Sequence, residues 1–216
     1  MTSEKEYEFI IKILIIGDST VGKTNFVYKF SEDKFSENYF ATTGIELKTS
    51  SIQIDGKSIK IQLWDTVGQE KYRAMIKNLY LKSQGIIILF DITNETSFIN
   101  LKNWMSQIKE SCGEDIPILL VGNKIDLEDN RVINKERAME YANNENIEYI
   151  EVSSKTGENI NKALTSLLQK ILKRADSNSN FSFTLDAGTV KKKQSIIVVK
   201  LKIKLYFFGK KRGRKK

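Results

Sequence analysis

The chain has no histidine and a single cysteine, Cys112, among its 216 residues. Histidine is the commonest metal ligand and general base in proteins, and one cysteine cannot form an internal disulfide. We therefore do not expect a zinc site or a catalytic triad that depends on histidine. The scarcity of cysteine is also typical of proteins that reside in a reducing compartment.

Long apolar runs are missing as well. Residues 1–8 are mostly charged or polar, unlike the apolar core of a secretory signal. No stretch approaches the ~20 apolar residues of a membrane span. We expect a protein that is made and kept in the cytosol. Its hydrophobic content of 40% is ample for one core, and its length suits one domain with a tail.

Positive charge is concentrated in the C-terminal part of the chain. The net charge is +8, but residues 176–216 contain 12 basic and 2 acidic residues and so carry +10. Residues 1–175 carry only −2. We predict a globular domain over residues 7–175, followed by a basic and largely disordered tail over residues 176–216.

The stretch from Gly17 to Thr24 matches G-x-x-x-x-G-K-[ST], a phosphate-binding loop. Its glycines permit a tight turn whose N–H groups point into one concavity, at the N-terminus of a helix that can begin at Lys23. An apolar strand candidate, Phe9 to Ile16, directly precedes it, as the motif requires. We expect Lys23 to reach the β- and γ-phosphates of a nucleotide and Thr24 to bind Mg²⁺. The loop residues expected around the phosphates are Ser19, Thr20, Val21, Gly22, Lys23 and Thr24.

Strand and helix candidates alternate along the chain. Strands are predicted at 9–16, 48–54, 57–64, 85–91, 116–121 and 147–152, and helices at 23–30, 71–82, 96–111, 134–144 and 159–174. Asp55-Gly56 favours a two-residue hairpin turn between the second and third strands, and Asn134 is a candidate helix cap. The alternation indicates an α/β fold with a mostly parallel sheet, helices on both faces and ligands at the carboxyl ends of the strands.

A second motif, Asp65-Thr66-Val67-Gly68-Gln69, follows the third predicted strand. In a nucleotide site an acid at this position can hold Mg²⁺, and the Gly68 N–H can bond the γ-phosphate. Gln69 is uncharged and cannot be a strong base, but its amide can orient a water molecule. These residue types favour phosphoryl transfer to water.

Base recognition is suggested by Asn123-Lys124-Ile125-Asp126, at the end of the fifth predicted strand. A carboxylate at Asp126 can accept two hydrogen bonds from the N1–H and the amino group of guanine, whereas adenine has an acceptor at N1. Ser153-Ser154-Lys155 follows the sixth strand and would offer backbone N–H groups to the guanine carbonyl oxygen. Taken together, the strand ends favour guanine over adenine.

In this order the motifs resemble those of a Ras-like small GTPase, most closely of the Rab branch. The resemblance covers about residues 7–175, and segments such as Gly44-Ile45-Glu46-Leu47 and Phe90-Asp91-Ile92-Thr93 point to Rab. It implies a P-loop NTPase (small G-protein) fold with a six-stranded sheet and one antiparallel edge strand. It also implies a switch that binds GTP and GDP with Mg²⁺, hydrolyses GTP, and regulates vesicle trafficking through an exchange factor, a GTPase-activating protein and effectors.

The resemblance assigns further roles to residues outside these motifs. Phe35 would pack edge-on against guanine, and Thr42 would complete the Mg²⁺ shell only when a γ-phosphate is present. Tyr39 would contact that phosphate, with an exposed surface aromatic as the alternative. Two switch segments, about Phe35 to Glu46 and Thr66 to Lys82, would be ordered by GTP and loosened by GDP.

An effector patch of Leu47, Trp64 and Leu79 is implied by the same resemblance. Leu47 and Leu79 stand where aromatic residues are usual, and Val67 stands where alanine is usual. Hairpin packing remains an alternative role for Leu47 and Trp64. These departures leave the identity of the effectors open.

The segment 176–216 contains no cysteine that could carry a prenyl group, so a stable lipid anchor is not expected from it. Four alternatives stay open for this segment: a disordered basic tail of no assigned role, attraction to anionic lipid, a nuclear-import or nucleic-acid patch at Lys210–Lys216, and an end that differs from the natural one. We expect a cytoplasmic monomer without other nucleic-acid contacts and leave peripheral association with endomembranes open. Alternative functions for the domain are a GTP-dependent binding module with negligible hydrolysis and a P-loop kinase.

We predict that Gln69→Leu slows single-turnover GTP hydrolysis and leaves GTP binding intact, because leucine cannot orient a water molecule through hydrogen bonds. Phosphate release from preloaded protein measures the rate, and nucleotide titration measures the affinity. Equal hydrolysis rates for the variant and the wild type would contradict the proposed role of Gln69.

Overall fold

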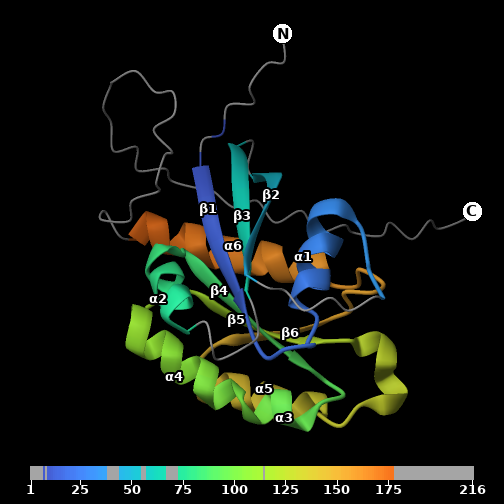
Figure 1. Cartoon of the computed structure of the whole chain (residues 1–216). Coiled ribbons are helices and arrows are strands. Elements are labelled where there is room, and N and C mark those ends of the chain that lie inside the picture. The colour runs from blue at the N-terminus through green and yellow to red at the C-terminus, as the bar shows by residue number, and fades with distance from the viewer. Residues whose placement is uncertain are drawn as a thin grey trace, which may run out of the picture.

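The computed structural model describes residues 7, 9–37, 44–54, 57–66, 73–113 and 115–177. Within these residues a six-stranded sheet with the order β2-β3-β1-β4-β5-β6 forms the centre of the protein (Figure 1). The strands are β1 (Phe9–Ile16), β2 (Ile45–Ile54), β3 (Lys57–Thr66), β4 (Gly85–Asp91), β5 (Ile118–Asn123) and β6 (Glu148–Val152). All pairings are parallel except that of β2 with β3, so the predicted sheet with one antiparallel edge strand is confirmed.

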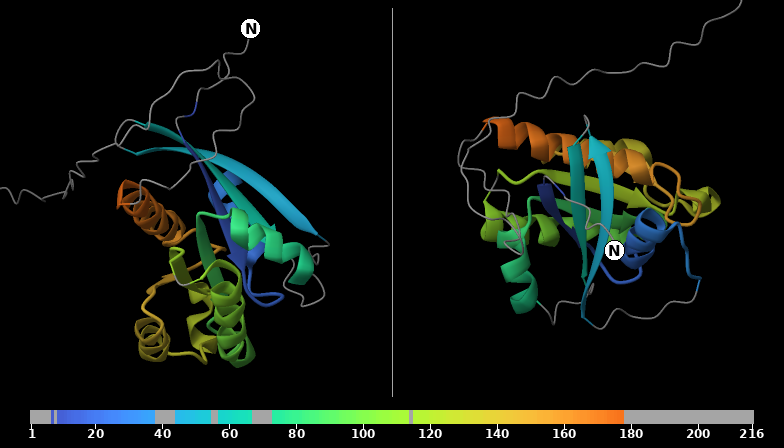
Figure 2. Two further views of the ribbon diagram at one scale, coloured as in Figure 1. Left: turned by 90° about the vertical axis from the view of Figure 1, so that its left-hand side faces the viewer. Right: turned by 90° about the horizontal axis from the view of Figure 1, so that it is seen from above.

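Helices lie on both sides of the twisted sheet (Figure 2). They are α1 (Lys23–Glu32), α2 (Arg73–Lys82), α3 (Glu95–Ile99), α4 (Leu101–Cys112), the 3₁₀ helix η2 (Ile125–Asn130), α5 (Lys135–Asn144) and α6 (Ile160–Ser177). Buried side chains of α1 and α6 pack on one face of the sheet, and those of α2, α3, α4 and α5 pack on the other. None of the helices in the described residues is long and apolar enough to cross a membrane.

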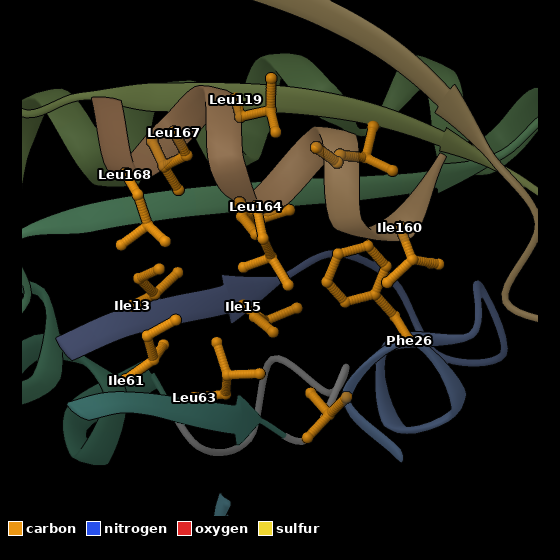
Figure 3. Packing of buried hydrophobic residues seen from close by; sticks show 14 of the residues in the cluster. Ile13, Ile15, Phe26, Ile61, Leu63, Leu119, Ile160, Leu164, Leu167 and Leu168 are labelled. Carbon is orange, nitrogen blue, oxygen red and sulfur yellow. The ribbon is translucent and has the colours of Figure 1, made fainter. Parts of the chain in front are cut away.

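The central strands divide their side chains between these two cores. In β1, Ile13 and Ile15 belong to the core under α1 and α6, whereas Leu14 and Ile16 belong to the opposite one. Figure 3 shows the first core, where Phe26 and other side chains from α1 and α6 point toward the isoleucines of β1. Because successive strand residues point to opposite faces, a strand that is covered on both faces must be apolar throughout. The apolar run before Gly17, which Lys12 alone interrupts, has this cause.

The largest differences from the predicted helix bounds concern the helix predicted over 96–111 and the last helix, while α1 extends two residues further than predicted, to Glu32. The helix predicted over 96–111 consists of α3 and α4, which are separated at Asn100. The apolar spacing continues across this residue, so the sequence pattern alone does not reveal the interruption. Helix α6 continues to Ser177 rather than ending at Arg174. The predicted cap of α5 is confirmed, because the Asn134 side chain accepts a hydrogen bond from the Arg137 N–H at 2.8 Å.

The topology brings the motif residues to one edge of the sheet. Gly17 follows β1, Asp65 lies at the end of β3, Asn123 ends β5 and Ser153 follows β6. The strands that carry them run in the same direction. Ligands of open parallel sheets bind at this carboxyl edge, so the candidate site lies there. The predicted hairpin turn Asp55-Gly56 falls outside the described residues.

Candidate functional site

The loop between β1 and α1 has backbone angles that suit an anion-binding hollow. Gly17 and Gly22 have φ angles of 138° and 97°, in the region that glycine adopts most readily. A Cβ atom at Gly17 would collide with the carbonyl oxygen of Leu89, and one at Gly22 would collide with the Asn123 side chain. Helix α1 begins at Lys23, directly after the N-cap residue Gly22. The positive end of the helix dipole therefore lies at the loop, where it favours an anion.

Lys23 is the buried cation of this loop. Its side chain donates hydrogen bonds from Nζ to the carbonyl oxygens of Gly17, at 2.9 Å, and Asp18, at 2.6 Å. Only 6% of the residue is exposed, and burial lowers the pKa of its ammonium group to about 8. Carbonyl oxygens compensate a desolvated charge only in part. A bound anion would restore the stability of the charged form.

Asp65 is the buried acid at the carboxyl end of the neighbouring strand, β3. Its Oδ2 accepts a hydrogen bond from the Thr24 hydroxyl at 2.6 Å, while Oδ1 has no hydrogen-bond partner among the described residues. Burial raises the pKa of this carboxyl group to about 6. A carboxylate and a hydroxyl are oxygen ligands of the kind that Mg²⁺ prefers. The donor set of Thr24 and Asp65 therefore fits a magnesium ion.

Asn123 connects three loops at the carboxyl edge. Its Nδ2 donates to the carbonyl oxygen of Val21 in the phosphate loop at 2.8 Å. Its Oδ1 accepts hydrogen bonds from both the N–H and the hydroxyl of Ser154, each at 3.0 Å. Because Asn123 is fully buried, loss of this side chain would leave several polar groups without partners. The structure thus gives Asn123 a bracing role beside the predicted contact with a base.

The Asp126 carboxylate is held by the loop that follows β6. The Ser153 hydroxyl donates to Oδ1 of Asp126 at 2.6 Å and accepts the N–H groups of Lys155 and Thr156. The N–H of Ser153 donates to the carbonyl oxygen of Glu158. Since the N–H of Ser154 already donates to Asn123, a guanine carbonyl would have to share or replace these bonds. The two segments that are predicted to recognise guanine are nevertheless in direct contact.

Asp91 is a site residue that the sequence analysis missed. It ends β4, and its Oδ2 lies 2.6 Å from Nζ of Lys124 in an ion pair. Its Oδ1 accepts hydrogen bonds from the N–H and the hydroxyl of Thr93. Lys124 has a φ angle of 73°, unusual for a residue with a side chain, and the ion pair helps to hold it there. An acid at the end of a buried strand, like Asp65, was the signal that could have identified Asp91.

Phe35 lies beside the loop that carries Lys155. The Lys155 ammonium is 6.0 Å from the centre of the Phe35 ring and 3.6 Å from a carboxylate oxygen of Glu37. The neighbouring Ser36 exchanges two backbone hydrogen bonds with the Asn25 side chain, at 3.0 and 3.2 Å. The segment after α1 is therefore attached to α1 on one side and lies next to the predicted base site on the other.

The other predicted residues divide into two groups. Tyr39, Thr42, Gly68 and Gln69 fall outside the described residues. Leu47 and Trp64 form a cross-strand pair between β2 and β3, and Leu47 is 47% exposed. Leu79 is only 7% exposed, because its side chain packs into the core between the sheet and helices α2, α3, α4 and α5. In this conformation it contributes little to an effector-binding surface.

Comparison with known proteins agrees with this geometry. The family model described as Ras family matches residues 12–173. The chain is 40% identical over 184 residues to human "Ras-related protein Rab-8B", covering 85% of this chain and 89% of the relative. It is 42% identical over 168 residues to "Ras-related protein Rab-13" of Canis lupus familiaris, covering 78% and 83%. It is 39% identical over 176 residues to "Ras-related protein Rab-8" of Diplobatis ommata, covering 82% and 84%.

We predict that Gly17→Ala lowers the free energy of unfolding by about 3 kcal/mol, because alanine adds both backbone strain and a clash with Leu89. Gly113→Ala is the matched control. Gly113 also has a positive φ, of 73°, but a Cβ atom there meets nothing within 4 Å. With its ψ of −165°, this residue lies in a region that essentially only glycine adopts, so the control should lose about 1–2 kcal/mol from backbone strain without a clash. Urea unfolding measures both values, and equal losses would contradict the predicted clash.

Proposed function

This chain belongs to the Ras family, and we propose that it is a Rab-type switch that hydrolyses GTP to GDP and phosphate to regulate intracellular vesicle trafficking. The observation that carries this proposal is the pair of under-compensated charges in the site, Lys23 and Asp65. A nucleotide phosphate with its magnesium ion brings both an anion and a cation to these positions. Few other ligands would satisfy the two groups at once.

The phosphate end of the nucleotide would lie in the loop from Gly17 to Thr24. From its place in the loop, Lys23 would reach the β- and γ-phosphates, and the first N–H groups of α1 would bond phosphate oxygens. Thr24 and Asp65 would hold Mg²⁺, which when bound neutralises part of the charge on those oxygens. Thr42 would join this set when a γ-phosphate is present.

The base would lie between the loops after β5 and β6. Asp126, oriented by the Ser153 hydroxyl, would accept the N1–H and the amino group of guanine. Lys124, held by Asp91, and Phe35 would contact the base from its faces and edge. This recognition favours guanine, because adenine cannot donate from N1.

Hydrolysis would depend on positioning rather than on a strong base. We assign Gln69 the task of orienting the attacking water, with Lys23 and the loop N–H groups stabilising the charge that develops on the phosphate. Gly68 and Tyr39 are assigned contacts with the γ-phosphate. Thr42 and Gln69 belong to the two proposed switch segments, which are separate in sequence from the loop. Binding of the γ-phosphate to both residues would therefore order the two segments together.

The expected partners follow from this role. We propose a monomer whose switch is timed by an exchange factor and a GTPase-activating protein and read by effectors at the exposed Leu47 and its neighbour Trp64. We place the protein in the cytoplasm with peripheral association with endomembranes. The +10 charge of residues 176–216 would favour an anionic membrane surface.

The direct test is nucleotide binding and phosphate release by the purified full chain. We expect tight Mg²⁺-dependent binding of GDP and GTP, weak binding of ADP, and slow release of phosphate from GTP. Equal affinity for ADP and GDP would refute the assignment of the base site. Tight GTP binding without any phosphate release, even with a GTPase-activating protein, would refute hydrolysis.

We predict that Asp126→Asn lowers the affinity for GDP by about 100-fold, because an amide cannot accept both guanine donors. The same variant should prefer xanthosine diphosphate, whose base carries a carbonyl where guanine carries its amino group. Asp129→Asn is the matched control, since Asp129 is an exposed acid on the same 3₁₀ helix. Competition against a fluorescent GDP measures the affinities of Asp126→Asn for GDP and for xanthosine diphosphate, and the affinity of Asp129→Asn for GDP. If the two variants behave alike, Asp126 does not read the base.

A further inference from the structure

Asp18 places a negative charge inside a loop that should bind phosphate. A carboxylate directed toward the bound phosphates would repel them. The structure directs it elsewhere: one oxygen accepts a hydrogen bond from Nδ2 of Asn100 at 2.7 Å, and the other from Nε1 of Trp104 at 2.8 Å. Both donors are uncharged, so these bonds hold the side chain in place without neutralising it.

The two donors belong to a rigid part of the fold. Trp104 is only 7% exposed and lies in the core formed with α2, α3 and α5. Asn100 lies between α3 and α4, and its carbonyl oxygen accepts the N–H groups of Asn103 and Trp104 in the first turn of α4. The Asp18 side chain therefore attaches the phosphate loop to the start of a well-packed helix.

The main chain of Asp18 contributes a further contact through its carbonyl group. Its carbonyl oxygen accepts the 2.6 Å hydrogen bond from Nζ of Lys23. The bonds that fix the Asp18 side chain on α4 therefore also fix its carbonyl group, which accepts a hydrogen bond from the Lys23 ammonium. Two residues later, Thr20 has a φ of 69°, a strained value for a β-branched residue that persists only where the surroundings determine the backbone.

We propose that Asp18 is a positioning residue that braces the phosphate loop on α4 through Asn100 and Trp104, and thereby slows nucleotide release. It acts through the loop rather than by touching the nucleotide. This inference rests on the proposed function, since it concerns the lifetime of a bound guanine nucleotide. It differs from the phosphate and base contacts because its partners are the side chains of a helix outside the site.

The test compares release of fluorescent GDP from Asp18→Ala, Trp104→Phe and the double variant of the full chain. Asp18→Ala loses both bonds and should release GDP about tenfold faster than the wild type. Trp104→Phe keeps an aromatic ring in the core but loses the donor, and should give a smaller increase, about threefold. If Trp104 acts through Asp18, the double variant should release GDP no faster than Asp18→Ala. Rates that multiply would overturn the proposal.

Competition by GMP separates positioning from general destabilisation. GMP lacks the β-phosphate that the loop would hold, so Asp18→Ala should reduce the affinity for GDP and leave that for GMP unchanged. An equal loss for both nucleotides would overturn the inference. Asn103→Ala, which removes an exposed side chain from the same turn of α4, is the control and should match the wild type.

The outcome for the wild type distinguishes this inference from the proposed function. If the wild type binds no guanine nucleotide, the proposed function fails and the inference fails with it. If the wild type binds GDP and Asp18→Ala releases it at the wild-type rate, only the brace is refuted.

Discussion

Desolvation of two opposite charges governs the chemistry of the site. Lys23 and Asp65 are both buried, and their nearest partners are carbonyl oxygens and a hydroxyl. Burial therefore lowers the pKa of the lysine and raises that of the aspartate, which means that each charged form is disfavoured by its surroundings. Such an arrangement costs stability in the folded protein, and a ligand that brings an anion and a cation together offsets this cost. The loop, α1 and the end of β3 are the elements that hold the two groups in place.

Much of this arrangement could be predicted because it has local causes. A strand that is buried on both faces must be largely apolar, so β4 was visible as a continuous apolar run and β1 as a run that only Lys12 interrupts. The glycines of the phosphate loop reflect a turn that side chains would obstruct. The parallel order of the strands then brings their carboxyl ends together without further information. For this reason Thr24, Asp65 and Asn123 were expected at one edge before any distance was known.

Contacts that depend on strand order and helix packing could not be predicted in this way. Asp18 and Trp104 are 86 residues apart, and the Asn123 side chain reaches Val21 across 102 residues. Neither pair has a spacing that a local pattern would detect. The interruption of the helix at Asn100 was missed because the apolar period continues through this residue. Leu79 was expected at the surface because the sequence of α2 alone does not determine which of its side chains pack on the sheet. Asp91 did have a local signal, its position at the end of a buried strand.

The phosphate loop is held from several directions, and this has a consequence for switching. Asn123 bonds the carbonyl of Val21, Lys23 bonds that of Gly17, and the Asp18 carboxylate bonds α4. A loop that is ordered in advance spends little of its binding energy on rearrangement. GDP and GTP share every group that such a loop would hold except the γ-phosphate, so a rigid loop binds both nucleotides tightly. A ligand shifts a conformational equilibrium only through differential contacts with the two states. A conformational response to the γ-phosphate must therefore come from residues outside the rigid loop. Thr42 and Gln69, which precede β2 and α2 in the sequence, are the candidates for this role.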